Sequence, residues 1–358
     1  MRVAIGLAAR GLGLTWPNPA VGCLIVAAGR VIGRGWTQVG GRPHAETIAL
    51  AQGGDAARGA TAYVALEPCA HHGKTPPCAE ALIAAGVARV VCALGDPDAR
   101  VSGRGFEMLR DAGIDVVEGV LEDEARIANA GFLSRVERGR PMMTLKLASS
   151  FDGRIATATG ESQWITGSEA RRHVHAMRAN HDAVMVGGGT ARADDPALTV
   201  RGWDVARQPV RIVVSRGLDI PLSGQLAQTA GDVPLWLCHG ADVSEDLQSA
   251  WRGLGAVLVP CTVRRGQLDM ADMMAQLGAL GLTRVFCEGG GALAASLLNA
   301  DIVDDLVGFG AGLALGAEGR ASIGPMGVDR LVDAPRFDLV RVGQVGADVM
   351  HHWRKRLA

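Results

Sequence analysis

The sequence has few aromatic residues, almost no net charge and no long apolar run. Aromatic residues make up 4% of its 358 residues, with a single tyrosine, so it offers no stacking platform for single-stranded nucleic acid. The formal net charge of −1 argues against a broad electrostatic surface for nucleic acid or membranes. No apolar stretch approaches the roughly 18 residues that cross a bilayer. These absences disfavour nucleic-acid-binding and membrane proteins.

The seven cysteines do not suggest a disulfide framework. Their number is odd and most lie inside apolar runs, as Cys23, Cys92 and Cys287 do, which is typical of buried thiols in a reducing compartment. The first residues resemble a short basic-then-apolar leader, but Arg10 interrupts the apolar run. We therefore expect an amphipathic first helix, no signal peptide and a cytoplasmic protein.

The length predicts two domains, on the order of 150 residues each. Apolar residues at 48% and charged residues at 20% are typical of globular domains with large cores. The polar segment from about Glu122 to Pro141, which ends in E-R-G-R-P, predicts a boundary. We expect a first domain at 1–120, a linker at 121–140 and a second domain at 141–358, with no internal repeat between the halves.

Short strands alternate with helices in both halves. In the first half, two strands at 21–36 meet at a glycine turn, and strands at 60–66 and 88–94 alternate with helices that begin near His44 and cover 76–86 and 106–113. In the second half, helices near 169–179, 270–280 and 291–299 separate some strands, and a β-hairpin closes the chain. This alternation predicts an α/β fold in which parallel strands carry helices on their faces.

A histidine and two cysteines form a candidate metal site in the first half. His44 stands in R-P-H-A-E-T-I-A-L, and Cys69 and Cys78 stand in E-P-C-A-H-H-G-K-T-P-P-C, with eight residues between them. One nitrogen and two thiolates leave the fourth position of a tetrahedral zinc ion to water, which is typical of a catalytic site. We expect both cysteines at helix N-termini, where the helix dipole favours the thiolate.

Glu46 has a structural and a catalytic interpretation. A carboxylate in the first turn of a helix stabilises the helix dipole. Beside zinc, the same carboxylate can move a proton between zinc-bound water and a leaving amine. Residues two apart on a helix diverge by about 200°, so the catalytic role requires that His44 precede the helix, as Pro43 indicates.

These motifs resemble the zinc-dependent cytidine-deaminase superfamily, whose pattern is H-x-E followed by P-C-x-x-C. The chain departs from it in the longer cysteine spacing. The longer segment between the two cysteines, together with N-P-A-V-G-C at 18–23, is similar to one branch of the superfamily, the bifunctional riboflavin-biosynthesis deaminase–reductases. This resemblance covers nearly the whole chain. It implies a cytidine-deaminase-like α/β/α domain and then a dihydrofolate-reductase-like α/β domain, with one zinc ion and NADPH as cofactors.

The resemblance also implies two reactions on a small phosphorylated pyrimidine. The first deaminates a diaminopyrimidinone that carries a ribosylamino 5-phosphate, and the second reduces the ribosyl group of the product to ribityl. In the first half, Asn18 could bind the base edge, or serve only as a turn residue before Pro19. Lys74, in a basic cluster with His71 and His72, could bind the phosphate or belong to a solvated loop.

The second half carries two glycine clusters at strand ends and no G-x-G-x-x-G. The segments V-M-V-G-G-G-T (184–190) and F-C-E-G-G-G-A (286–292) each follow an apolar strand. The second continues into a helix, whose first backbone amides can bind an anion. Tight turns also use glycine, so one cluster is weak evidence, but two favour a dinucleotide site.

Four segments resemble the reductase half of the family: T-L-K-L-A-S-S-F-D-G-R-I-A, G-E-S-Q-W-I-T, D-D-P-A-L-T-V-R and C-E-G-G-G. The resemblance implies NADP contacts at Ala148, Trp164, Thr190, Asp194, Ser215, Gly290, Gly291, Ala292, Leu293, Ala294, Ala295 and Ser296. It implies substrate contacts at Ser162, Arg178, Leu198, Arg201 and Glu288. Arg178 and Arg201 could grip the phosphate bidentately or form surface salt bridges. Arg216, just after a strand, could contact the 2′-phosphate of NADP.

Lys146 and Asp194 are candidate catalytic residues near the reacting carbon. Burial in T-L-K-L-A would lower the pKa of the lysine, whereas an outward position on the strand would leave it solvated. Two other functions stay open. A base deaminase for nucleic acid or nucleosides is disfavoured by the charge and the few aromatics, and a nucleotide sensor with structural zinc would need a fourth protein ligand. A homo-oligomer also stays open, because members of the family are often oligomeric.

Overall fold

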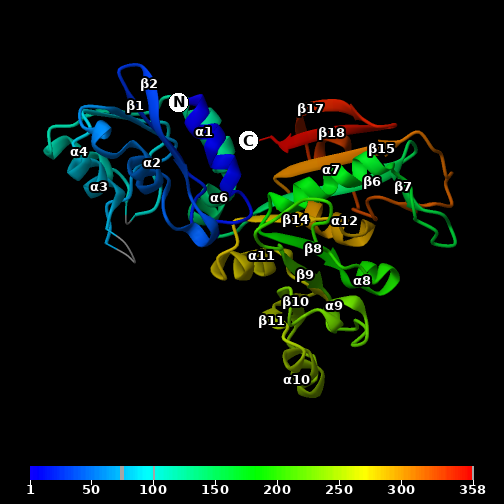
Figure 1. Ribbon diagram of the computed structural model, residues 1–358. Coiled ribbons are helices and arrows are strands. Elements are labelled where there is room, and N and C mark those ends of the chain that lie inside the picture. Colours follow the sequence, from blue (N-terminus) through cyan, green and yellow to red (C-terminus); the bar gives the residue numbers. More distant parts are fainter. Residues whose placement is uncertain (73–75, 100, 357–358) are drawn as a thin grey trace. The chain divides into compact units, whose positions relative to one another are not determined.

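The computed structural model describes residues 1–72, 76–99 and 101–356 of the chain (Figure 1). The chain divides into two compact units, Met1–Gly139 and Arg140–Ala358, and each has its own main sheet. Both units are mixed α/β, as the sequence predicts. None of the described helices has both the length and the apolarity that a bilayer crossing requires.

The first unit is built on a five-stranded sheet in the order β2-β1-β3-β4-β5. β1 pairs antiparallel with β2 and β3, whereas β3, β4 and β5 are parallel. The carboxyl ends of β3 and β4 therefore meet at one edge of the sheet, where the loops to Cys69 and Asp96 begin. The strands are β1 (Gly22–Ala27), β2 (Arg30–Trp36), β3 (Thr61–Val64), β4 (Arg89–Cys92) and β5 (Asp115–Val117).

Helices pack on both faces of this sheet. Along β1, Cys23 and Ile25 belong to the core that includes residues of α2 and α3. Leu24 points to the other face, where it packs with Ala4 and Leu7 of α1, because successive side chains of a strand alternate in direction. The helices are α1 (Arg2–Ala8), α2 (Ala45–Gly53), α3 (Cys78–Ala85), α4 (Arg104–Asp111), α5 (Glu122–Ala128) and α6 (Ala130–Arg138).

The segment 121–140, expected to be a linker, forms α5 and α6 in the first unit. Ala125 of α5 and Phe132 and Leu133 of α6 are buried in the same core as β1, β3 and β4. The division between the units falls between Gly139 and Arg140. Most of the charged residues that suggested a linker lie on the exposed faces of α5 and α6, whereas Arg140 begins the second unit.

The second unit is built on a nine-stranded sheet in the order β11-β10-β9-β8-β14-β6-β15-β18-β17. The strands from β11 to β15 in this order are parallel. β18 and β17 join antiparallel and form the predicted closing hairpin. The strands are β6 (Met142–Ser150), β8 (Ala183–Gly187), β9 (Val210–Val214), β10 (Leu235–Gly240), β11 (Val257–Cys261), β14 (Arg284–Cys287), β15 (Asp305–Ala311), β17 (Phe337–Val345) and β18 (Asp348–Lys355).

The order of the strands reverses near the centre of this sheet. After β6, the chain builds β8 to β11 outward, and it then returns to place β14 between β8 and β6. Ligands of parallel α/β sheets bind where the order reverses, beyond the carboxyl ends of the strands. The helices are α7 (Ser168–Ala179), α8 (Gly188–Asp194), α9 (Gln225–Gln228), α10 (Glu245–Gly253), α11 (Met270–Ala279) and α12 (Gly291–Asn299).

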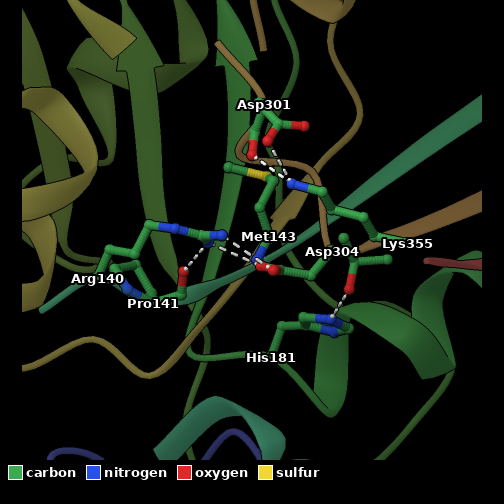
Figure 2. A network of polar contacts seen from close by, with 8 residues as sticks. Arg140, Pro141, Met143, His181, Asp301, Asp304 and Lys355 are labelled. Atoms are coloured by element: carbon green, nitrogen blue, oxygen red, sulfur yellow. Dashed lines mark hydrogen bonds and ion pairs between the residues drawn. The ribbon is translucent and has the colours of Figure 1, made fainter. Parts of the chain in front are cut away.

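A buried ion pair fixes the start of the second unit (Figure 2). Arg140 donates to the two carboxylate oxygens of Asp304 at 2.8 and 2.9 Å. Asp304 also accepts a hydrogen bond from the backbone N–H of Met143 at 2.8 Å. The side chains of Arg140 and Asp304 are only 13% and 11% exposed, so the pair ties the first residue of this unit to the loop before β15.

Candidate metal centre and reductase cavity

His44 lies directly before α2, as the catalytic interpretation of Glu46 requires. Its backbone is extended, with φ −72° and ψ 161°, and α2 begins at Ala45. Glu46 is in the first turn of the helix, while His44 is outside it. The two side chains are therefore not forced to opposite sides of one helix.

The structure brings His44, Cys69 and Cys78 together, as predicted. Nδ1 of His44 lies 3.3 Å from Sγ of Cys78 and 3.6 Å from Sγ of Cys69, and the three ligand atoms lie within 4.8 Å of one another. Usual zinc–nitrogen and zinc–sulfur distances place tetrahedral ligands about 3.5 Å apart, so the group fits a zinc ion. Within residues 1–72, 76–99 and 101–356 this group has three members, which leaves one coordination position open.

Both thiols lie at or contact the N-terminus of α3. Cys78 is its first residue, as expected, but Cys69 lies in the loop after β3 and not at a helix N-terminus. The backbone N–H of Cys78 nevertheless donates to Sγ of Cys69 at 3.3 Å. A hydrogen bond from the Cys78 thiol, helped by this N–H, lowers the pKa of Cys69 to about 4. The same bond raises the pKa of Cys78, because the two sulfurs share one proton.

Glu46 is buried beside this group, with only 3% of the residue exposed. Its carboxyl contacts the Cys78 thiol, and burial raises the pKa of Glu46 above its ordinary value. A carboxyl in such surroundings holds a proton at higher pH than a solvated one. Glu46 thus lies in the first turn of α2, as the helix-dipole interpretation expects, and beside the candidate zinc ligand Cys78, as the catalytic interpretation expects.

Asn18 lies against the turn that leads to His44. A Cβ on Gly41 would lie 2.0 Å from Nδ2 of Asn18, and Gly41 has a φ of +83°. Both facts require glycine at this position. Asn18 is thus next to the segment that carries His44 and Glu46, whereas Lys74 lies outside the described residues.

Glu67 is a positioning residue that the sequence did not reveal. It is buried, with 4% exposed, and its carboxylate accepts hydrogen bonds from the backbone N–H groups of Asp96, Gly103 and Gly105 at 3.0–3.1 Å. Gly105 packs so closely on the Pro68 carbonyl that a Cβ there would lie 2.0 Å from the oxygen. Glu67 therefore ties the backbone before Cys69 to the start of α4. A glutamate directly after an apolar strand was the available signal.

The second unit contains a cavity of about 470 Å³ at the reversal of strand order. β6 contributes Lys146 and Ala148, β8 contributes Val186, and Glu288 follows β14; α7 and the segment 194–201 form further walls. Nine of the residues that the resemblance implies for the reductase line this cavity, and the candidate catalytic residue Lys146 lines it too. The nine are Ala148, Ser162, Trp164, Arg178, Thr190, Asp194, Leu198, Arg201 and Glu288.

Ser215 and residues 290–296 are not among the residues that line the cavity. The Ser215 hydroxyl donates to Asp219 at 2.5 Å. Within α12, the side chains of Leu293, Ala294 and Ala295 are buried in the core. Gly290 has a φ of +64°, and a Cβ there would lie 3.1 Å from Oγ1 of Thr190. Gly290, which directly precedes α12, thus lies next to Thr190 of the cavity wall.

A buried group of charges occupies one wall of the cavity. Arg178 binds both carboxylate oxygens of Glu288 and donates to the Thr199 carbonyl at 2.7 Å. Nζ of Lys146 lies 4.0 Å from Glu288. Burial lowers the pKa of Lys146, and Glu288 partly opposes this. Lys146 therefore faces the cavity and not the solvent, and a phosphate at Arg178 would compete with Glu288.

The remaining predicted residues of this site lie nearer to the solvent. Burial raises the pKa of the Asp194 carboxyl above its ordinary value. Trp164 is 64% exposed, and the Arg171 guanidinium lies 4.5 Å from the centre of its ring. Arg216, considered for the 2′-phosphate, forms an ion pair with Asp242 at 2.7 Å.

Both units match known protein families. Residues 1–94 match the cytidine and deoxycytidylate deaminase zinc-binding region, and residues 141–351 match the RibD C-terminal domain. The fold and the sites therefore define a zinc-binding deaminase domain followed by a reductase domain with a dihydrofolate-reductase-like fold.

Similar proteins contain both domains in one chain. The sequence is 43% identical to riboflavin biosynthesis protein RibD of Escherichia coli strain K12, over 98% of this chain and 97% of that one. Acinetobacter baumannii RibD, form 1, has a similar structure, with a TM-score of 0.89 and 38% identity over 99% of this chain and 98% of that one.

A third relative is the diaminohydroxyphosphoribosylaminopyrimidine deaminase/5-amino-6-(5-phosphoribosylamino)uracil reductase of Thermotoga maritima. Its structure matches with a TM-score of 0.86 and 33% identity, over 99% of this chain and 97% of that one. The chain belongs to the family of bifunctional riboflavin biosynthesis deaminase–reductases. Its function is therefore deamination and reduction in riboflavin biosynthesis.

Proposed function

We propose that the first unit deaminates a diaminopyrimidinone that carries a ribosylamino 5-phosphate. We further propose that the second unit reduces the ribosyl group of the product to ribityl with NADPH. The observation that carries the proposal is the group of His44, Cys69 and Cys78, three ligands among the described residues, with the buried carboxyl of Glu46 beside it. Three protein ligands would leave the fourth position of a tetrahedral zinc ion to water. The Thermotoga maritima relative bears the names of both activities.

In the deaminase site, His44, Cys69 and Cys78 would hold the zinc ion. When bound there, the ion would supply the chemistry that turns a water molecule into a nucleophile near neutral pH. Glu46 takes a proton from the attacking water and delivers one to the departing amine. Glu67 would hold the backbone before Cys69 against the start of α4, and the backbone N–H of Cys78 would hold Sγ of Cys69. Asn18 would contact the base edge, and Lys74 would contact the phosphate.

In the reductase site, NADPH supplies the hydride, and the residues of the cavity orient both molecules. Asp194, whose pKa is raised by burial, can give a proton to the ring oxygen of the ribose as the ring opens. Lys146, whose side chain also lines the cavity, can bind the same ring oxygen. We assign the NADPH contacts to Ala148, Trp164, Thr190, Asp194, Ser215 and 290–296, and the substrate contacts to Ser162, Arg178, Leu198, Arg201 and Glu288.

We place this enzyme in the cytoplasm, with a small phosphorylated pyrimidine as its partner and no nucleic acid. All seven cysteines are unpaired, which suits a reducing compartment. Because members of the family are often oligomeric, we also propose a homo-oligomer. Light scattering of the purified protein would test this assembly.

Metal analysis and a coupled assay test the proposed function. The purified protein is expected to carry one zinc ion per chain, to release ammonia from the diaminopyrimidinone phosphate without NADPH, and to oxidise NADPH once the deaminated product is present. Cys78→Ser should lose zinc and ammonia release but still oxidise NADPH with the deaminated substrate, because the two sites lie in separate units.

Cys92→Ser is the matched control for this variant. Cys92 is a buried thiol of the same unit that donates to the Leu94 carbonyl, and a serine hydroxyl can keep that bond. It should retain zinc and both activities. A folded wild-type protein that binds no zinc, or releases no ammonia, would contradict the deaminase proposal. Loss of both activities in folded Cys78→Ser would contradict separate sites.

A further inference from the structure

One face of α7 lines the reductase cavity. The residues that contribute to it recur at intervals of three and four, which places them on one side of a helix. They are Arg171, Val174, His175 and Arg178. His175 is the member of this face with no role so far, and it lies one turn before Arg178.

His175 and Arg178 form hydrogen bonds with the backbone of the wall segment 199–201. Arg178 donates to the Thr199 carbonyl at 2.7 Å, and the backbone N–H of Arg201 donates to Nδ1 of His175 at 3.2 Å. Leu198, just before this stretch, is buried and has a φ of +54°, a conformation that is unfavourable for a residue with a side chain. The stretch 199–201 is thus held at two points as the chain leaves a strained turn.

We propose that His175 positions Arg201 for the reductase substrate. By accepting the Arg201 backbone N–H, the imidazole fixes where the exposed guanidinium of Arg201 enters the cavity, and it thereby sets the affinity for the substrate phosphate. The inference rests on the proposed reductase function. His175 is a positioning residue, since it acts through Arg201 and takes no part in the chemistry.

The contact requires a neutral imidazole, because only an unprotonated Nδ1 can accept a hydrogen bond. Burial lowers the pKa of His175 below the ordinary 6.5, and the charges of Arg178 and Arg201 lower it further. Glu288 and the Thr199 carbonyl oppose this shift. The charged groups that share the cavity with His175 are Arg171, Arg178, Lys146, Glu288, Asp194, Asp195 and Arg201. His175 is therefore neutral at pH 7 and gains a proton only in more acidic solution.

Three variants test this role. His175→Ala removes the acceptor and should raise KM for the deaminated, phosphorylated substrate about tenfold at pH 7.5, the equivalent of about one hydrogen bond, with a smaller change in kcat. His175→Asn places a side-chain oxygen near the position of Nδ1 and should restore most of the affinity. His173→Ala is the control, because His173 is on the same helix but packs edge-on against Phe309, 5.8 Å between ring centres, and should keep the wild-type KM.

The pH profile separates positioning from a merely structural role. In the wild type, KM should rise toward acid pH, since protonated His175 can no longer accept the Arg201 N–H. The substrate phosphate also titrates, near pH 6, but it does so equally with every variant. The ratio of KM in the wild type to KM in His175→Asn should therefore increase toward low pH, and this ratio isolates His175.

Three results would overturn the inference: an unchanged KM in His175→Ala, equal impairment of the Asn and Ala variants, or a constant KM ratio at all pH values. If His175→Ala does not fold, as judged by thermal unfolding, the pH dependence of the ratio decides alone. A wild-type enzyme that does not oxidise NADPH with this substrate would contradict the proposed function instead, so the two failures are distinguishable.

Discussion

At the scale of single residues, burial sets the chemistry of both sites. The carboxyls of Glu46 and Asp194 have pKa values raised by burial, so each can carry a proton that a solvated carboxyl would lose. Burial lowers the pKa of Lys146 in the same way, which weakens its hold on a proton. Perturbed groups of this kind are concentrated where catalysis needs proton transfer near neutral pH.

Glu46→Gln tests the proton-transfer role directly. The amide fills nearly the same volume but cannot take up a proton, so zinc content should stay at the wild-type level while kcat for ammonia release falls at least 10²-fold, roughly the range of general acid–base catalysis. Glu80→Gln is the control, because Glu80 lies in the first turn of α3 and pairs with His72 at the surface. Turnover of Glu46→Gln close to that of Glu80→Gln would rule the role out.

At the scale of elements, Glu67 connects three parts of the first unit. It follows β3, precedes Cys69, and binds backbone amides of the loop after β4 and of the start of α4. A charged acceptor that satisfies three N–H groups away from water is hard to replace. The position of one zinc ligand thus depends on a loop that carries no ligand itself.

Glu67→Gln should therefore destabilise the first unit and loosen its metal. Its single amide oxygen cannot serve all three donors, and an unsatisfied buried N–H costs about 1–3 kcal/mol. Urea unfolding should shift to lower denaturant concentration, and a chelator should remove zinc faster than from the wild type. Glu107→Gln, an exposed change in the first turn of α4, should alter neither. Identical chelation rates in the two variants would show that Glu67 does not hold the site.

The sequence predicted the elements that carry strong local signals. The helices at 169–179, 270–280 and 291–299 correspond to α7, α11 and α12. Pro43 marked the boundary that leaves His44 outside α2. The segment 121–140 was misleading, since the charges that suggest a linker equally suit the outer faces of α5 and α6. Its buried residues, such as Phe132 and Leu133, show their role only when the core is assembled.

The sites were predictable to different degrees. His44, Cys69 and Cys78 could be predicted, because their residue types are the ones that bind zinc. The hydrogen bond from the Cys78 backbone N–H to Cys69 could not, because it depends on how the loop folds. Glu67 and His175 act through backbone groups distant in sequence. Such contacts produce no characteristic residue spacing in the sequence, because any residue other than proline can offer a backbone N–H.

At the scale of the whole molecule, each unit has its own core and its own buried polar groups. In the second unit, His181 is 7% exposed. Its ring contacts the Met177 carbonyl at 2.7 Å and the Thr144 hydroxyl at 3.0 Å. A ring that donates from Nδ1 and accepts at Nε2 is neutral, and burial lowers its pKa to about 4. The fold therefore excludes a proton that the unfolded chain would bind.

This exclusion predicts that the second unit loses stability in mild acid. The pKa of His181 is about 4 in the folded state and 6.5 in the reference state, so between these values the unfolded state binds more protons and stability falls as the pH falls. The full loss amounts to about 3 kcal/mol. His181→Gln removes the titration, and urea unfolding at pH 7 and pH 4 should show a smaller decrease for the variant than for the wild type. Equal decreases would mean that His181 does not couple the fold to pH, because every other titrating group is common to both proteins.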